Sequence, residues 1–291
     1  MSAATHDDID WAARLSAMRR LDMLERDAVR GVGAKLAGGL PPGAVVVDAG
    51  CGAGGMSTAL ASVLRENGGG RLVLVDASDA LLAAAREAAV AAGGETVSVT
   101  TVAADVATDP LDTRVPQADL VWASAMVHHL PDQQAGVTVL ARLLAPGGML
   151  ALAEGGTGQT FIPWDIGLGR AGLEARLNAA RDAWFGELRA GIEGAIAMPY
   201  GWTAALSRAG LGEPTSFSYL VEHSAPLDET ARQYVVERFT WLAETVGDRV
   251  DPADRETLAA LTDPGSPHYV GGRDDAFVLY ARTVHTARRL S

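Results

Sequence analysis

An acid followed by a run of glycines is the pattern in this sequence with the clearest chemical meaning. An apolar run at residues 45–47 ends in Asp48, and glycines follow at positions 50, 52, 54 and 55. Glycine lets the backbone turn sharply and lets a ligand approach more closely than a Cβ atom would allow. Residues 56–64 read as a helix, so this segment predicts a strand, a glycine turn and a helix in succession.

A second acid ends the next apolar run. Residues 72–75 form this run, and Asp76 follows it directly. In nucleotide-binding βαβ units, an acid about 20 residues after the glycine turn accepts hydrogen bonds from the hydroxyls of a ribose. The two patterns together therefore predict a site for a ligand that contains a ribose.

Two adjacent histidines are the candidates for acid–base chemistry. His128 and His129 follow the predicted fourth strand, at the edge of a parallel sheet where ligands bind. One of them would then serve as a general base; the alternative is that both simply begin a helix or pack sideways. No metal site is expected, because the histidines have no obvious carboxylate partner. Cys51 is expected to fill space in the turn, because no base is evident beside it.

Composition limits the class of protein and its partners. The 291 residues carry a net charge of −12, 48% of them are hydrophobic, and there is one cysteine. The lone cysteine suits a reducing compartment, and the sequence shows no apolar run long enough for a membrane span. We therefore expect a cytoplasmic protein that binds no membrane. Nucleic acid is disfavoured as a partner, because such binding draws on basic groups that here form no dense block.

Strands that alternate with helices predict an α/β fold with a mostly parallel sheet covered on both faces. The predicted strands lie at 44–48, 72–76, 97–103, 118–123 and 149–154, and the helices between them at 55–66, 79–91 and 132–144. One or two helices precede them at 9–38. After residue 154 the alternation stops, and the pattern predicts helices at 160–197, 200–209, 228–247 and 252–261, with strands at 215–221 and 277–284.

The large aromatic side chains are concentrated in the second half of the chain. Of 16 Trp, Tyr and Phe residues, only Trp11 and Trp122 precede residue 155. Aromatic side chains suit a pocket for an organic substrate, and Trp164, Tyr200 and Trp202 are the candidates for it. The alternative is that these side chains form the core beneath the added helices.

Several ordered segments resemble one enzyme family. Asp48-x-Gly50-x-Gly52-x-Gly54 resembles motif I of the class I S-adenosylmethionine-dependent methyltransferases. Residues 74–86, 104–106, 121–132 and 143–150 resemble the later motifs of that family, and the two C-terminal strands resemble its last two. The resemblance implies a Rossmann-like sheet of seven strands with an antiparallel last strand and a helical cap.

The resemblance also implies a role for each matching residue. The three glycines of motif I would pass under the amino-acid end of S-adenosylmethionine, and Asp48 would bind near its amino group. Asp76 would bind the ribose, with Ala77 on the adenine. The adenine amino group would donate to Asp105, and Ala123 and Ser124 would lie beneath the sulfonium. Val106 would cover the adenine ring. Capping of the next helix is the alternative for Asp48, and a loop role is the alternative for Asp105.

These expectations give a domain plan and a function. The plan is an N-terminal helical lid at 1–42, a cofactor-binding core at 43–154, a helical cap with the acceptor pocket at 155–199, and the rest of the core at 200–291 with a helical insertion near 228–270. The expected function is methyl transfer to an O, N or C atom of a small organic acceptor, which the sequence does not identify, and a homodimer is left open. The alternatives are a methyltransferase for protein or RNA, a nicotinamide-dependent oxidoreductase and a non-catalytic cofactor-binding scaffold.

Overall fold

The computed structural model describes residues 11–290, which form two compact units. We call residues 11–156, 193–219 and 282–290 the sheet unit, and residues 157–192 and 220–281 the helical unit. Residues 1–10 of the predicted lid, including the start of the helix predicted at 9–38, lie outside the described residues. No helix within 11–290 is both long and apolar enough to cross a membrane.

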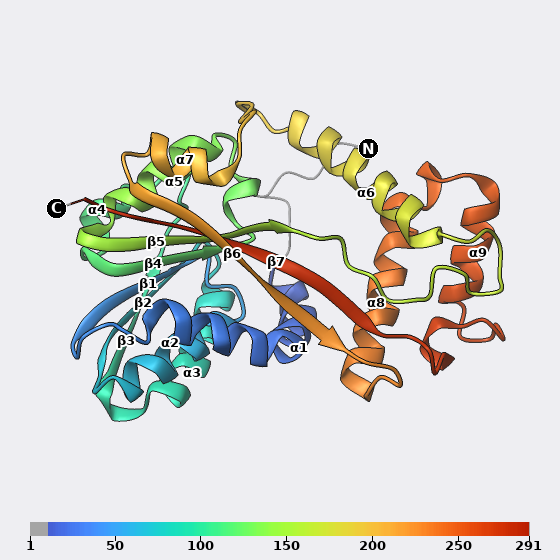
Figure 1. Cartoon of the computed structure of the whole chain (residues 1–291), viewed down its shortest axis with the longest axis horizontal. Helices are drawn as coiled ribbons and strands as arrows, with labels where there is room; N and C mark the ends of the chain where they lie inside the picture. Colours follow the sequence, from blue (N-terminus) through green and yellow to red (C-terminus); the bar gives the residue numbers. More distant parts are fainter. Residues whose placement is uncertain (1–10, 291) are drawn as a thin grey trace. The chain divides into compact units, whose positions relative to one another are not determined.

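The sheet has seven strands in the order β3-β2-β1-β4-β5-β7-β6 (Figure 1). β1 to β5 are parallel, and β7 is antiparallel to β5, as the resemblance implies. The predicted fold class is therefore confirmed. The strands are β1 (Ala44–Ala49), β2 (Gly70–Asp76), β3 (Val97–Ala103), β4 (Ala118–Ser124), β5 (Leu144–Gly156), β6 (Gly212–His223) and β7 (Val278–Arg288).

The helices of the sheet unit cover both faces of its sheet. Side chains alternate along each strand, so Val47 and Val73 enter one hydrophobic cluster, whereas Val46 and Leu72 enter the other. Both clusters consist mainly of aliphatic side chains. The helices are α1 (Trp11–Ala37), α2 (Gly55–Glu66), α3 (Asp79–Gly93), α4 (Leu111–Arg114), α5 (Gln133–Arg142) and α7 (Trp202–Arg208), with the short 3-10 turns η2 (Gly94–Thr96) and η3 (Val127–His129).

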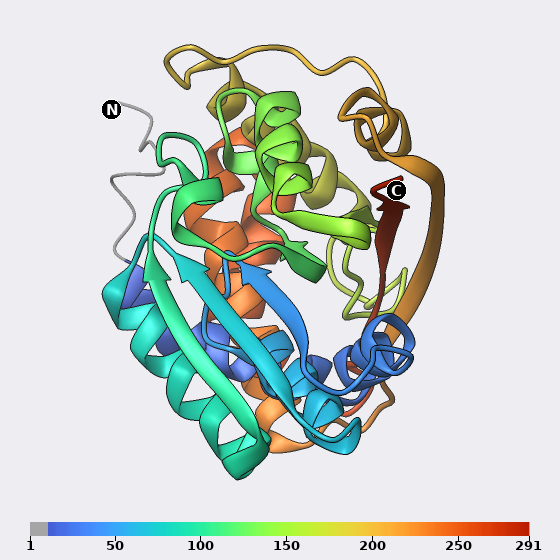
Figure 2. The same cartoon turned by 90° about the vertical axis from the view of Figure 1, so that its left-hand side faces the viewer.

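The carboxyl ends of the central strands meet at one edge of the sheet (Figure 2). β1 pairs with β2 on one side and with β4 on the other, and Ala49 lies opposite both Val75 and Ala123. Ser124 lies opposite Ala153 of β5. Because strand order reverses between β1 and β4, this edge is where ligands bind in open α/β sheets.

The C-terminal half of α1 is part of the sheet unit's core. Val32 and Leu36 lie in the cluster that also holds α2, and a Cβ atom on Gly33 would lie 3.2 Å from Cβ of Ala59. Glu25 of the same helix forms a 2.8 Å ion pair with Arg282 of β7. This half of α1 is therefore fixed on the sheet unit by packing and by charge.

The helical unit combines two distant stretches of the chain. It contains α6 (Leu173–Ala190), α8 (Glu229–Val246) and α9 (Pro252–Thr262), with the 3-10 turns η4 (Gly247–Arg249) and η5 (Val270–Gly272). The predicted helix at 160–197 was too long: α6 begins only at Leu173, since glycines at 167, 169 and 172 adopt positive φ angles before it. The predicted cap at 155–199 also differs from the observed unit, because residues 193–199 belong to the sheet unit.

Two smaller corrections concern β5 and α5. The strand predicted at 149–154 extends over Leu144–Gly156, so that it includes the turn predicted at residues 146–148. Its register against β4 shifts between Ala118 and Leu120 to accommodate that turn. The helix predicted at 132–144 covers Gln133–Arg142, with Asp132 as the side-chain cap of its first turn.

Candidate active site

The glycine turn after β1 adopts backbone angles that favour glycine. The φ angles are +70° at Gly50, +54° at Gly52 and +97° at Gly54. The backbone N–H groups of Gly50 and Cys51 both donate to the carbonyl oxygen of Val75, at 2.8 and 3.1 Å. These bonds fix the turn onto the end of β2, so that β1, the turn and β2 form one rigid edge.

The glycine turn also leaves little room for side chains. A Cβ atom at Gly54 would lie 2.7 Å from the Cα atom of Ala85, so α3 packs directly against the backbone there. Cβ atoms at Gly50 and Gly52 would approach Met126 and Met18, at 2.8 and 2.9 Å. Methionine is unbranched and adaptable, so these two side chains can shift when a ligand lies on the turn, whereas a Cβ atom on the turn itself could not.

Three carboxylates surround the turn. Asp48 is only 2% exposed and accepts a 2.6 Å hydrogen bond from the Ser57 hydroxyl. Asp76 accepts from the backbone N–H groups of Gly52 and Ser78, at 3.1 and 3.0 Å. The Asp22 side chain of α1 lies against Gly55, whose backbone lowers the pKa of the Asp22 carboxyl.

Burial raises the pKa of two of these acids. Burial, with smaller contributions from the negative charges of Asp76 and Asp22, raises the pKa of Asp48 to about 7. Burial and the charge of Glu25 likewise raise the pKa of Asp22 to about 6. Carboxylates held together in this way gain from a nearby positive charge. The turn and its acids therefore fit a cofactor that carries a cationic group and a ribose.

The capping alternatives are partly resolved by the structure. Ser78 caps α3, so Asp76 is not needed as its cap. Gly54 is the N-terminal cap residue of α2, and Asp48 contacts that helix only through the Ser57 hydroxyl. Asp105 accepts a 2.8 Å hydrogen bond from Ala107 two residues later. Its carboxylate therefore takes part in a local turn, as the loop interpretation expects.

The other predicted cofactor residues lie along the same sheet edge. Ala77 is exposed immediately after β2, Val106 is buried, and Ala123 and Ser124 end β4. Ala125 follows with a φ angle of +49°, in the region that L-residues rarely adopt. Burial raises the pKa of the Cys51 thiol, so this cysteine stays protonated and fills space as expected.

His128 has a carboxylate partner that the sequence interpretation missed. Its Nδ1 atom lies 2.6 Å from Oε2 of Glu154, whose side chain is almost fully buried. The other oxygen of Glu154 accepts from the backbone N–H groups of Met126 and Val127, at 3.0 and 2.8 Å. Glu154 therefore fixes both the η3 turn and the His128 ring.

The two histidines differ in their surroundings. The His129 ring lies 4.2 Å from that of His128, centroid to centroid, tilted by 40°. The 2.6 Å hydrogen bond with Glu154 is formed by His128. The sequence did contain a signal that could have pointed to Glu154, because this acid directly follows an apolar run, as Asp48 and Asp76 do. His285 of β7, also missed, lies 3.1 Å from the Glu154 carbonyl oxygen through Nε2.

The three predicted pocket aromatics are not equivalent. Trp164 belongs to the helical unit and is 76% exposed. Tyr200 and Trp202 belong to the sheet unit and pack against its core. The Tyr200 hydroxyl donates to Gln134 at 3.0 Å, and the Arg208 guanidinium stacks on its ring. These contacts favour the core interpretation for Tyr200 and Trp202.

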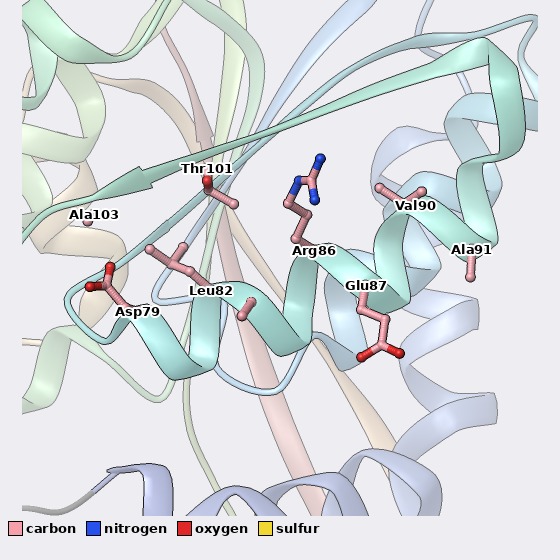
Figure 3. Close-up of a pocket in the computed structure, with 9 residues that line it drawn as sticks. Asp79, Leu82, Arg86, Glu87, Val90, Ala91, Thr101 and Ala103 are labelled. Carbon is pink, nitrogen blue, oxygen red and sulfur yellow. The ribbon is translucent and has the colours of Figure 1, made fainter.

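An open groove lies elsewhere on the sheet unit, between α3 and the edge strand β3 (Figure 3). None of the predicted cofactor or catalytic residues lines it. Its lining mixes apolar and charged side chains: Asp79, Leu82, Ala83, Arg86, Glu87, Val90, Ala91, Thr101 and Ala103. The groove therefore marks a surface of α3, and the glycine turn remains the site that fits a cofactor.

Sheet order, glycine turn and strand-end acids together define a Rossmann-like domain of the methyltransferase type. A family profile described as a methyltransferase domain matches residues 47–150. Residues 47–150 therefore resemble a methyltransferase domain, and S-adenosylmethionine is the cofactor that this resemblance implies. The resemblance seen in the sequence is thus confirmed, and the nicotinamide-dependent alternative is disfavoured.

Two curated relatives and one solved structure resemble the chain. It is 31% identical over 150 residues to 27-O-demethylrifamycin SV methyltransferase of Amycolatopsis mediterranei, covering 51% of this chain and 48% of that protein. It is 36% identical over 113 residues to trans-aconitate 2-methyltransferase of Variovorax paradoxus, covering 39% of each. The chain thus matches less than half the length of these relatives. The YcgJ protein of Bacillus subtilis shares the fold with a TM-score of 0.51 and 18% identity, over 91% of this chain and 100% of that one.

Proposed function

We propose that this protein transfers the methyl group of S-adenosylmethionine to a small organic acceptor, with His128 as the general base. The observation that carries the proposal is the 2.6 Å contact between His128 and buried Glu154, at the same sheet edge as the glycine turn. Met126, two residues before His128, packs toward Gly50 of that turn. The dyad and the turn are therefore neighbours within the sheet unit.

The residues around the turn would hold the cofactor. Asp48 would bind near the amino group, Asp76 the ribose and Asp105 the adenine amino group. Ala77 and Val106 would contact the adenine, and Ala123 and Ser124 would lie beneath the sulfonium. The glycines at 50, 52 and 54 would pass under the amino-acid end of the cofactor. When bound, S-adenosylmethionine supplies an activated methyl group on a good leaving group. The protein's own task is to align the acceptor with that methyl group and to remove a proton.

The buried carboxylate determines what His128 can do. With Glu154 as the acceptor at Nδ1, this nitrogen would carry the hydrogen, and Nε2 would be the basic atom of the ring. Nε2 would take the proton of an acceptor hydroxyl, amine or activated carbon. Glu154 would stabilise the imidazolium that forms, as a carboxylate does behind a catalytic histidine.

Two lines of support favour a small acceptor. The related proteins are named for methylation of a rifamycin precursor and of trans-aconitate, which are small organic molecules. The net charge of −12 disfavours RNA, whose binding requires basic groups on phosphates. Methyl transfer to protein or RNA remains the alternative.

Mass spectrometry tests the proposed function directly. The purified protein is incubated with S-adenosylmethionine that carries a deuterated methyl group and with extracts of small molecules. We expect a labelled small product and an equivalent amount of S-adenosylhomocysteine. Label found only in protein or RNA would overturn the small-acceptor assignment, and no tight binding of S-adenosylmethionine by calorimetry would overturn the cofactor site.

The raised pKa of Asp48 predicts a pH dependence of cofactor binding. The folded protein without cofactor holds a proton on Asp48 up to about pH 7, whereas the unfolded chain loses it near pH 4. The resulting stability is complete below about pH 4 and is lost as pH rises through 7. A cationic cofactor favours ionised Asp48, so its affinity should rise several-fold between about pH 6 and 8, with release of protons.

Calorimetry in buffers of different ionisation enthalpy measures that release. Asp48→Asn should bind more weakly and should lose most of the pH dependence. Asp112→Asn is a suitable control, since Asp112 lies on α4, away from the glycine turn. An affinity for S-adenosylmethionine that does not vary with pH in the wild-type protein would contradict the placement of Asp48 beside the cationic end of the cofactor.

Trp164→Ala tests whether the exposed aromatic takes part in acceptor binding. Trp164 contributes little to a buried core, so its removal should leave the melting temperature unchanged within about 2 °C. If Trp164 contacts the acceptor, turnover should fall at least about tenfold while affinity for S-adenosylmethionine is kept. Tyr200→Ala should instead lower the melting temperature, because Tyr200 packs on the core. Normal turnover in Trp164→Ala would remove this residue from the acceptor site.

A further inference from the structure

Arg238 on α8 is a partly buried cation. Its Nε atom is sealed from solvent and has no hydrogen-bond partner within the described part of the chain. Among the side chains that the structure describes, residues 14–290, none forms an ion pair or hydrogen bond with its guanidinium group. The guanidinium group lies over the ring of Trp241, whose centroid lies 4.2 Å from the Arg238 Cζ atom.

Glu174 is the acid whose charge acts on Arg238, and it balances that charge only in part. Both oxygens of Glu174 accept from backbone N–H groups, of Phe161 at 2.9 Å and of Ile162 at 3.1 Å. Burial also raises the pKa of Glu174 to about 7, so its negative charge is incomplete at neutral pH. The negative charge of Glu174 therefore balances the positive charge of Arg238 only in part.

Arg181 is a neighbouring cation. Burial of Arg238 and, to a smaller extent, the charge of Arg181 lower the pKa of Arg238 to about 10. Arg181 itself has a partner, because its guanidinium group donates to the neighbouring Asp182 at 2.7 Å. Of these two arginines, only Arg238 forms no ion pair with a side chain among residues 14–290.

Burial of an unpaired charge is costly, and proteins retain it where a ligand supplies the opposite charge. We infer that Arg238 is an anion-binding residue, and that the helical unit binds a small molecule through a carboxylate of that molecule. The carboxylate site lies wholly within the helical unit and does not rest on the proposed function.

Charge and shape both favour a carboxylate. One guanidinium group without a partner balances one negative charge, whereas a phosphate dianion requires a second cation, and Arg181 is already paired. The planar fork of arginine matches a carboxylate with two parallel hydrogen bonds. Trp241 holds the guanidinium plane, and Trp184 packs edge-on against Trp241 with ring centroids 5.7 Å apart. The Arg238 side chain is therefore already ordered before the anion binds, so binding costs little conformational entropy.

Thermal melting in the absence of cofactor tests this site. The probes are millimolar benzoate, citrate and trans-aconitate, each beside its neutral amide, together with inorganic phosphate. We expect at least one carboxylate, and none of the amides, to raise the melting temperature of the wild-type protein by about 2 °C or more. Arg238→Met should abolish that increase, and Arg238→Lys should weaken the binding about tenfold, because lysine keeps the charge and loses the fork.

Arg238→Met also has a distinctive effect without ligand. Removing an unpaired buried charge while keeping the side-chain volume should raise the melting temperature by about 2–4 °C. The matched control on the same helix is Arg232→Met. Arg232 donates to the carbonyl oxygens of Gly271, Arg273 and Leu227, at 2.9 to 3.2 Å, so its loss should lower the melting temperature.

Three results would overturn the inference. The first is a wild-type protein that no carboxylate stabilises more than its amide does. The second is an Arg238→Met protein that responds to carboxylates as the wild type does. The third is stabilisation by inorganic phosphate alone, which would assign a different anion.

Discussion

Replacing His128 with Asn should lower the turnover number about 10²- to 10⁴-fold, while the affinity for S-adenosylmethionine changes little. The reason is that removal of a positioned general base costs about this much, whereas the glycine turn and its acids are left in place. Steady-state kinetics with the acceptor identified by mass spectrometry measure the turnover number, and calorimetry measures the affinity. The melting temperature should stay close to that of the wild type, because His128 is only partly buried.

Glu154→Gln separates the base from its support. The amide oxygen can still accept from Met126 and Val127, so the η3 turn should be kept. The amide nitrogen, however, would donate toward Nδ1 of His128 and favour the tautomer whose hydrogen lies on Nε2. Turnover should fall nearly as far as in His128→Asn, and the double variant should be little worse than either single one.

His129→Asn is the control for this pair. His129 stacks on the His128 ring, whereas the 2.6 Å bond to Glu154 belongs to His128. Its loss should therefore lower turnover by less than about tenfold. If His129→Asn were the more damaging change, the base would be His129. If all three variants kept normal turnover, the acceptor would need no base, and alignment alone would account for the reaction.

Local patterns in the sequence were enough to place the strands and the glycine turn. Apolar runs such as residues 72–75 form buried parallel strands, and the positive φ angles at Gly50 and Gly52 explain why glycine stands there. The acids Asp48 and Asp76 were found because each directly follows such a run. Sequence order alone therefore placed Asp48 and Asp76 at the same edge of the sheet as the glycine turn.

Contacts between distant residues could not be obtained in this way. The bond between His128 and Glu154 depends on the adjacency of β4 and β5 and on the register that sets Ser124 opposite Ala153. The sequence shows both residues but not that register. The histidines consequently seemed to lack a carboxylate partner, although one lies 26 residues further along the chain.

The helical unit was the least predictable part for a related reason. Its stability depends on contacts between segments far apart in the sequence, such as the pair of Arg176 on α6 with Asp254 on α9 at 2.6 Å. No periodicity within residues 157–192 reveals that residues 220–281 belong with them. The lone charge of Arg238 is likewise visible only once α6 and α8 are packed together.

Gly52→Val should abolish binding of S-adenosylmethionine, with a loss of affinity of at least about 100-fold, and should leave the sheet unit folded. Gly52 has a φ angle of +54°, and its N–H donates to Asp76 at 3.1 Å. Valine resists this backbone angle, so the turn would change shape and the bond that orients Asp76 would be lost. The new side chain would also enter the space beside Met18 over the turn.

Backbone strain alone would lower stability without being specific to binding, so the comparison is with Gly43→Val. Gly43 precedes β1 in the same unit with a φ angle of +82°, and a Cβ atom there would meet nothing within 4 Å. Both variants should lose about 1–2 kcal/mol of unfolding free energy, because both force a β-branched residue into the left-handed region. Only Gly52→Val should lose the cofactor in calorimetry. If the two proteins bound S-adenosylmethionine equally well, the glycine turn would not be the cofactor site, and the roles proposed for Asp48 and Asp76 would fail with it.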